Sequence, residues 1–217
     1  MLQSREIKLL AAFDHRHILV DPTPDPHASW AERKRLFDLP RSSWADYDAK
    51  LISKGGGIFP RTAKEITLSE EMKSLAGLLK DKATPQELMR ALLTAHVDLL
   101  FFGGIGTFIK SSTQANVDVG DRTNDALRIN GRDIRAAVVG EGANLGVTQL
   151  GRIEYARQGG PDRRGGRINT DAIDNSAGVD TSDHEVNIKI LLNGPLRRGQ
   201  LSPTERDSML AFMTEDV

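Results

Sequence analysis

Apolar residues in the second half of the chain follow two alternating patterns, which predict strands and helices in turn. Residues 97–102 (VDLLFF) and 136–139 (AAVV) are nearly continuous apolar runs, as in strands that are buried on both faces. Residues 148–158 then carry apolar side chains at helical spacing, and residues 167–173 (RINTDAI) return to a strand-like run. This order of elements favours an α/β fold with a parallel sheet.

The beginning of the chain predicts a hairpin. Residues 8–13 (KLLAAF) and 17–20 (HILV) are two apolar runs only three residues apart. A parallel crossover needs about a dozen residues, so we expect these two strands to pair antiparallel. Residues 21–27 (DPTPDPH) contain three prolines, which fix extended geometry and remove amide donors, and they should interrupt regular structure.

Polar residues with capping spacing mark several helix starts. A capping box needs a Ser or Thr at the start of the helix and an acidic residue three positions on. Ser29 with Glu32 and Ser43 with Asp46 predict two short helices, over WAERKRLF and WADYDAKL. Thr84 with Glu87 predicts a helix that runs to about residue 95, and Ser202 with Glu205 predicts a last helix near the end of the chain. Two glycine-rich stretches, residues 54–57 and 159–166, are predicted to be loops.

Residues 174–193 (DNSAGVDTSDHEVNIKILLN) combine a polar half with an apolar half. The apolar half, from Val186 onward, predicts a helix that is buried nearly all round. Ser182 and Glu185 lie three residues apart and are predicted to cap this helix. Capping leaves seven small or polar side chains without a role: Asn175, Ser176, Gly178, Asp180, Thr181, Asp183 and His184.

Composition narrows the classes of protein to consider. The 217 residues suffice for one hydrophobic core, and 29 basic against 30 acidic residues give a net charge of −1, so nucleic acid and anionic membranes are not the expected partners. The chain has no cysteine, which excludes disulfides, thiolate zinc sites and thiol catalysis, and we expect no metal. Its most apolar window, residues 97–109, is too short to span a bilayer, so we expect a cytoplasmic protein.

Small or polar residues follow four of the five predicted strands. They are Asp14 after KLLAAF, GGIGT at 103–107, EGANLG at 141–146 and DNSAG at 174–178. In an open parallel sheet, ligands bind outside the carboxyl ends of the strands, so these four segments predict one shared site on one edge of the sheet. No complete G-x-G-x-x-G motif follows a strand, and these residues alone indicate only a ligand of nucleotide size.

Longer segments of the chain resemble a known family. FDHRHILVDP, RSSWADYDAKLISKGGGIFPR, FGGIGTFIK, GDRTNDALRINGRDIRAAVVGEGANLGVTQLGRIEYA and GRINTDAIDNSAGVDTSDHEVNIKILLN resemble the catalytic segment of the large bacterial NAD-specific glutamate dehydrogenases. The resemblance implies a Rossmann-like fold, a mainly parallel sheet with flanking helices and one reversed strand. It implies that residues 1–193 are a partial dinucleotide-binding domain and residues 194–217 a C-terminal helical extension.

The resemblance also implies that the chain is a piece of a longer polypeptide. The first strand with its glycine-rich turn, the glutamate-binding part and the catalytic Lys and Asp would precede it. Without that first strand, KLLAAF and VDLLFF should each have an unpaired inner edge. We expect the chain alone to pair these two strands with each other, to associate through the gap, or to keep an open groove.

Site residues carry over from the family position by position. Asp14 would lie near the adenosine ribose, or else serve only as a turn residue. Gly103, Gly104 and Gly106 would pass close to the cofactor, and Glu141 and Asn144 would lie near the nicotinamide ribose. Asn175 would contact the nicotinamide carboxamide, and Ser182 would contact the side-chain carboxylate of glutamate. Lys54 is read as a loop residue and His184 as structural; all of these positions are read from the sequence.

The implied reaction is the transfer of a hydride from L-glutamate to NAD, which yields 2-oxoglutarate and ammonia. The chain would supply the cofactor-binding part of a parent enzyme that is a homo-oligomer, and the chain alone should be inactive. Two alternatives stay open: a dehydrogenase of another amino acid, and a nucleotide-binding or interaction module without catalysis. The first is favoured if Ser182 points away from the nicotinamide site, and the second if the four strand ends do not converge.

Overall fold

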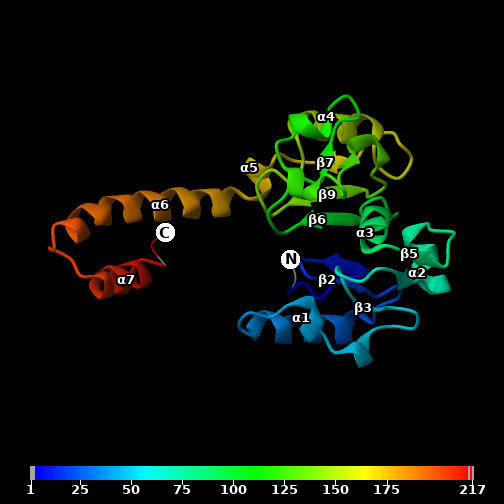
Figure 1. Cartoon of the computed structure of the whole chain (residues 1–217), viewed down its shortest axis with the longest axis horizontal. Helices are drawn as coiled ribbons and strands as arrows, with labels where there is room; N and C mark the ends of the chain where they lie inside the picture. Colours follow the sequence, from blue (N-terminus) through cyan, green and yellow to red (C-terminus); the bar gives the residue numbers. More distant parts are fainter. Residues whose placement is uncertain (1–2, 215, 217) are drawn as a thin grey trace.

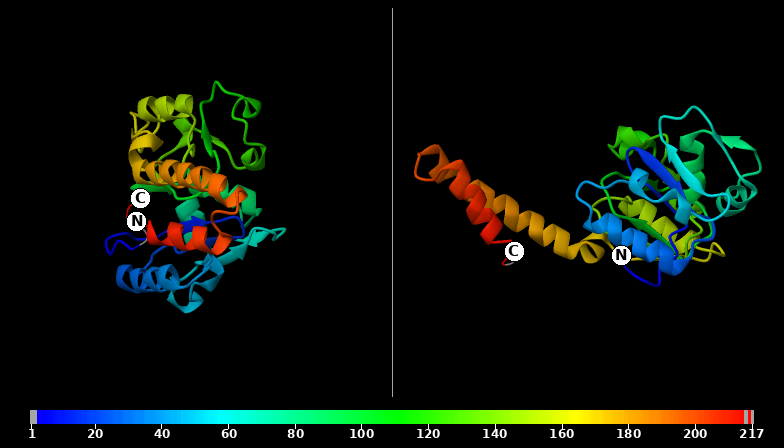
Figure 2. Two further views of the ribbon diagram at one scale, coloured as in Figure 1. Left: turned by 90° about the vertical axis from the view of Figure 1, so that its left-hand side faces the viewer. Right: turned by 90° about the horizontal axis from the view of Figure 1, so that it is seen from below.

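The computed structural model describes residues 3–214 and residue 216. The strands are β1 (Ala11–Phe13), β2 (His17–Val20), β3 (Gly57–Pro60), β4 (Ile66–Thr67), β5 (Lys82–Ala83), β6 (Leu99–Phe102), β7 (Ile109–Lys110), β8 (Ile129–Asn130), β9 (Val138–Glu141) and β10 (Arg167–Ile168). The α-helices are α1 (Pro26–Asp38), α2 (Glu70–Ala76), α3 (Pro85–Leu93), α4 (Gln149–Gln158), α5 (Asp171–Asp174), α6 (Ser176–Arg197) and α7 (Pro203–Phe212). The ten strands of the described residues lie in one body, from which the long helix α6 projects (Figures 1 and 2). The last helix, α7, folds back beside α6.

The N-terminal strands form an antiparallel sheet in the order β1-β2-β3. Phe13 pairs with Ile18 across the hairpin, so the predicted antiparallel pairing is confirmed. Strand β3 begins at Gly57, in a stretch predicted to be loop, and pairs with β2. A Cβ on Gly56 would lie 2.4 Å from the Val20 carbonyl oxygen, so the glycine lets the two backbones approach.

A second sheet is parallel, in the order β10-β9-β6. Helix α4 covers one face, where Tyr155, Val139 and Phe102 are buried together. On the opposite face Leu99 and Phe101 are 39% and 37% exposed, beside a hollow of about 430 Å³. The nearly continuous apolar sequence of β6 predicted burial on both faces, and only one face is covered within the described residues.

The predicted α/β class is confirmed, but the prediction of one mainly parallel sheet is wrong. The described residues form one antiparallel and one parallel three-stranded sheet, and two small sheets, β4-β5 and β7-β8. Strands β1 and β6 are edge strands of different sheets and do not pair with each other, which excludes the expected closure between them. The Rossmann-like arrangement stays a prediction.

Local capping explains most helix starts. The reciprocal bonds of the predicted capping boxes at Thr84–Glu87, Ser202–Glu205 and Ser43–Asp46 are all present. The Ser43–Asp46 box does not begin the predicted α-helix: it begins a 3₁₀ turn, η1 (Trp44–Asp46), which a second 3₁₀ turn, η2 (Ala49–Leu51), follows. The predicted cap at Ser29 is wrong. Helix α1 begins at Pro26, because Asp25 accepts a bond from the Ala28 amide (2.7 Å) and proline suits the first helical position.

The polar stretch folds differently from its prediction. Strand β10 ends at Ile168, and residues predicted to continue it form helix α5. Helix α6 then starts at Ser176, so the capping role of Ser182 is wrong: its hydroxyl donates to the Gly178 carbonyl (2.8 Å) inside the helix. The prediction of a buried helix is also wrong, because α6 leaves the body and Leu191 is 73% exposed (Figure 1).

Candidate functional site

Hydrogen bonds bring three of the four predicted segments together at the carboxyl ends of β6 and β9. The Gly142 amide donates to the Phe102 carbonyl (2.8 Å), which joins the segments that follow the two strands. Strand β9 ends at Glu141, two residues later than the sequence predicted, and the Glu141 amide donates to Oδ2 of Asp174 (3.1 Å). Residues 103–106, 142–146 and 169–178 therefore lie at one end of the parallel sheet, and we name them the strand-end cluster.

Two asparagine side chains face each other within the strand-end cluster. Asn175, which precedes α6, donates from Nδ2 to Oδ1 of Asn144 (2.7 Å); Asn144 is exposed and Asn175 is half-buried. The Asn144 amide nitrogen and the Asn175 side-chain oxygen make no other bond with a described residue. A primary amide both donates and accepts, so this pair can bind a ligand that carries a carboxamide.

The glycine loop after β6 is exposed and open. A Cβ on Gly104 would meet nothing within 4 Å, whereas Gly106 has φ +131°, a conformation that other residues rarely adopt. Thr107 fixes the far end of the loop, since its hydroxyl donates to the Leu145 carbonyl (2.7 Å) in the neighbouring loop. Gly103 is exposed as well. Through the Thr107–Leu145 bond, the loop lies next to the segment that carries Asn144.

Glu141 is engaged by the protein itself. Its side chain is fully buried and accepts a bond from Nη1 of Arg152, which also donates to the Asn169 carbonyl. The other carboxylate oxygen accepts from the Val147 amide (3.1 Å). Burial raises the pKa of Glu141, and contact with Arg152 offsets part of the rise. The Glu141 carboxylate is therefore closed to solvent in this conformation.

Asp14 lies in the antiparallel sheet, so the prediction that it shares a sheet edge with the other three segments is wrong. Its Oδ1 accepts from the Arg16 and His17 amides (2.7 Å each) and closes the β1–β2 turn. Burial raises the pKa of Asp14, but hydrogen bonds from the Arg16, His17 and Trp44 backbones outweigh it and the pKa lies below its usual value. A hollow of about 520 Å³ lies beside Asp14, lined also by Phe37 and Trp44.

Aromatic rings connect the end of β1 with the end of β6. The Phe13 ring lies 6.0 Å from the Phe108 ring, edge to face, and Phe108 stacks on Phe102 at 5.7 Å. Phe13 directly precedes Asp14, and Phe102 is the last residue of β6. Asp14 is thus linked by packing to the end of the parallel sheet that carries the strand-end cluster, although it belongs to another sheet.

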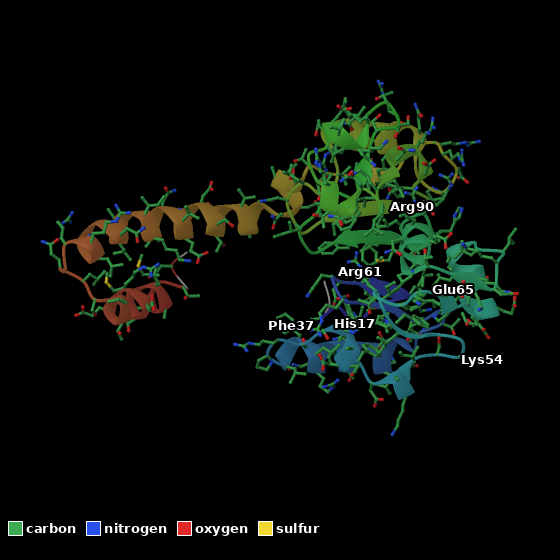
Figure 3. The ribbon with its side chains drawn as sticks, in the orientation of Figure 1. His17, Phe37, Lys54, Arg61, Glu65 and Arg90 are labelled. Atoms are coloured by element: carbon green, nitrogen blue, oxygen red, sulfur yellow. The ribbon has the colours of Figure 1, made fainter. Side chains whose placement is uncertain are left out.

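Three further predicted residues lie outside the cluster or make only local contacts. Ser182 follows Asn175 by seven residues, so it lies about 10 Å further along the same face of α6. His184 contacts the Asp180 carbonyl (2.9 Å) within the helix. Lys54 is 92% exposed, pairs with Glu71 (3.2 Å) and lies across the body from α6 (Figure 3), which supports its reading as a loop residue.

Arg152 and Asp171 were not singled out by the sequence. Arg152 sits on the predicted helix 148–158 and looks like an ordinary charged surface position. Asp171 fell inside a predicted strand, where an acid had no evident partner. Only the approach of α4 to residues 169–174 brings the two within 3.7 Å, so no local pattern could have revealed them.

The described residues hold no cluster of three or more His, Cys, Asp or Glu side chains suited to a metal ion. In the same part of the chain, no helix has the length and apolar character needed to cross a membrane.

Fold and site together define an α/β protein with a candidate ligand site, a cluster of glycine and asparagine residues at the ends of parallel strands. The family model described as bacterial NAD-glutamate dehydrogenase, catalytic domain, matches residues 1–217. The chain belongs to this family. NAD-specific glutamate dehydrogenases of Halomonas elongata, Pseudomonas aeruginosa and Mycobacterium tuberculosis are 56%, 55% and 54% identical to it over the whole chain, which spans 13% of the length of each.

Proposed function

We propose that this chain is the cofactor-binding segment of an NAD-dependent glutamate dehydrogenase, which converts L-glutamate, NAD and water to 2-oxoglutarate, ammonia and NADH. The observation that carries the proposal is the Asn144–Asn175 pair at the carboxyl end of the parallel sheet, where the two side chains are joined by a hydrogen bond of 2.7 Å. Ligands of α/β proteins bind at this end of the strands. The names of the relatives supply the cofactor and the substrate.

Asn144 and Asn175 would bind the nicotinamide end of the cofactor. The carboxamide of nicotinamide has one acceptor and two donor positions, which match the groups that the asparagine pair has available. Gly103, Gly104 and Gly106 would let the backbone approach the cofactor where a side chain would occupy the same space. Glu141 would act near the nicotinamide ribose only through the backbone it holds, because its carboxylate is buried against Arg152.

Asp14 would bind the adenosine end. One of its carboxylate oxygens is used in the β1–β2 turn, and the Trp44 backbone also hydrogen-bonds to the carboxylate, so a ribose hydroxyl would share the acceptor positions that remain. The adjacent hollow of about 520 Å³ has apolar walls at Phe37 and Trp44, which suit a planar base. The turn role and the ribose role are compatible in this geometry.

Ser182 would contact the side-chain carboxylate of glutamate. Its place on the same face of α6 as Asn175 supports a substrate next to the nicotinamide ring. The hydroxyl now donates to the Gly178 carbonyl, so it must rotate to donate to a carboxylate instead. Because the Ser182 hydroxyl is bonded to the helix backbone in this structure, a dehydrogenase of another amino acid stays the alternative function.

The chemistry would be shared between this chain and the rest of the parent. When bound, NAD would supply the acceptor for the hydride of the glutamate α-carbon, and Asn144, Asn175 and Ser182 of this chain would bind and orient the two reactants. The resemblance assigns proton transfer to a Lys and an Asp outside this segment, so the chain alone should be inactive. A cytoplasmic location and a homo-oligomeric parent stay predictions.

Calorimetric titration of NADH into the full-length parent, its Asn175→Ala variant and the isolated chain tests the proposal. The parent should bind NADH, and the variant should bind it about 2- to 150-fold more weakly, since one or two hydrogen bonds of about 0.5–1.5 kcal/mol each are lost. An Asn187→Ala variant on the exposed side of α6 is the matched control. Equal affinity of the parent and Asn175→Ala would contradict the assignment of Asn175 to the cofactor.

A further inference from the structure

We infer that Arg152 is a positioning residue for the cofactor: it holds together the two backbone segments that carry Asn144 and Asn175. The inference rests on the proposed function of that pair. Arg152 lies in the first turns of α4 and its side chain is only 8% exposed. No group of Arg152 reaches the exposed asparagine pair, so it acts through the segments it binds.

The guanidinium of Arg152 bridges the start of both segments. Nη1 donates to the Glu141 carboxylate, at the point where β9 passes into residues 142–146, and to the Asn169 carbonyl, where residues 169–175 begin. Nη2 lies 3.7 Å from Oδ1 of Asp171 in the second segment. One planar side chain thus fixes the spacing of two loops that are distant in sequence.

Further bonds between the two segments depend on that spacing. Oδ2 of Asp171 accepts from the Leu145 amide (3.0 Å), next to Asn144, and Oδ2 of Asp174 accepts from the Glu141 amide (3.1 Å), where β9 passes into residues 142–146. Leu145 has φ +59°, which a leucine adopts only when its surroundings enforce it. The Asp171 contact therefore holds a strained residue directly beside the cofactor-binding amide.

The charges make Arg152 the single cation of this network. Glu141 is fully buried and Asp171 has a side chain 23% exposed, and within the described residues only Arg152 pairs with either. Without a cation, the buried Glu141 carboxylate would be unpaired, which is strongly unfavourable, and the two acidic segments would separate. Lysine keeps the charge but lacks the planar fork, so it cannot make both Nη1 bonds and the Nη2 contact at once.

Steady-state kinetics of the full-length parent with Arg152→Lys tests the inference. Small displacements of a binding group can cost up to about 100-fold, so we expect the KM for NAD to rise roughly 10- to 100-fold, with the KM for glutamate and the melting temperature changed far less. Arg157→Lys, an exposed position on the same helix that makes no ion pair with a described residue, is the control and should match the parent.

A double-mutant cycle separates positioning from a merely structural role. If Arg152 acts through the asparagine pair, Arg152→Lys should add little to the rise in NAD KM already caused by Asn175→Ala. Full additivity, an unchanged NAD KM in Arg152→Lys, or a loss of melting temperature with both KM values raised equally would overturn the inference.

Two outcomes distinguish this inference from the proposed function. If Asn175→Ala raises the NAD KM and Arg152→Lys does not, positioning fails and the proposed site stands. If Asn175→Ala has no effect, the proposed site itself fails. Should Arg152→Lys not fold, Asp171→Asn gives the same test, because it removes the charge beside Arg152 while keeping an acceptor for the Leu145 amide; an unchanged NAD KM would then contradict the inference.

Discussion

Replacement of Gly178 by alanine should weaken cofactor use without weakening the fold. Gly178 lies in the first turn of α6, where a Cβ would sit 2.2 Å from Oδ1 and 3.3 Å from Nδ2 of Asn175. Two non-bonded heavy atoms cannot lie 2.2 Å apart, so the Asn175 amide must rotate away and lose its hydrogen bond to Asn144. The helix itself gains, because alanine exceeds glycine in helix propensity by up to about 1 kcal/mol.

The magnitude follows from the hydrogen bonds at stake. Displacement of Asn175 would cost the cofactor one or two bonds of about 0.5–1.5 kcal/mol each, a total of roughly 0.5–3 kcal/mol. A tenfold change corresponds to about 1.4 kcal/mol, so the KM for NAD should rise by roughly 2- to 150-fold. Loss of the Asn175–Asn144 hydrogen bond, which is exposed to solvent, offsets part of the gain in helix stability.

The assay is steady-state kinetics of the full-length parent with varied NAD, with thermal unfolding of the same samples. We expect a higher NAD KM with a melting temperature equal to or above that of the parent. Asn187→Ala, an exposed position of α6 whose side chain bonds only to the Asp183 carbonyl, controls for helix propensity. An unchanged NAD KM in Gly178→Ala would refute the role given to Asn175.

Three further predictions concern other parts of the chain. Ser182→Ala in the parent should raise the KM for glutamate and leave that for NAD unchanged, at about 1.5–3 kcal/mol for a bond to a carboxylate; an untouched glutamate KM and turnover would exclude the contact. Tyr155→Phe should lower the free energy of unfolding by about 1–3 kcal/mol, because the buried hydroxyl donates to the Ala136 carbonyl (2.9 Å); a denaturant titration that shows no loss would exclude this bond. Hydrogen bonds from Lys80 and from the Thr84 cap lower the pKa of Glu87 from 4.5 to about 2, so its stabilising effect is complete above pH 4.5 and is lost as the pH falls toward 2. The difference in melting temperature between the chain and Glu87→Gln should therefore narrow below pH 4.5, and a difference independent of pH would contradict this.

Local chemistry made part of this fold predictable. The capping boxes at Thr84 and Ser202 close within four residues, so their sequence contains the whole interaction. The β1–β2 hairpin was predictable for a similar reason, because three residues permit only antiparallel pairing. The small and polar residues after the predicted strands also indicated where three of the four segments gather in the structure.

Long-range contacts decided what the sequence left open. Strand β3 is rich in glycine and proline and exists because β2 pairs with it, which no local propensity indicates. The apolar spacing of α6 identified a helix correctly, but spacing does not reveal whether anything covers the apolar face. The Arg152 network depends on α4 meeting residues 169–174, an approach set by tertiary packing.

Hydrogen–deuterium exchange of the full-length parent, with and without saturating NAD, tests the central claim most directly. If this segment binds the cofactor through the strand-end cluster, NAD should slow exchange in peptides that cover residues 103–107, 142–146 and 174–178, with no comparable change at the exposed end of α6 or in α7. Protection confined to other parts of the parent, with these three segments unchanged, would contradict the proposed role of the chain.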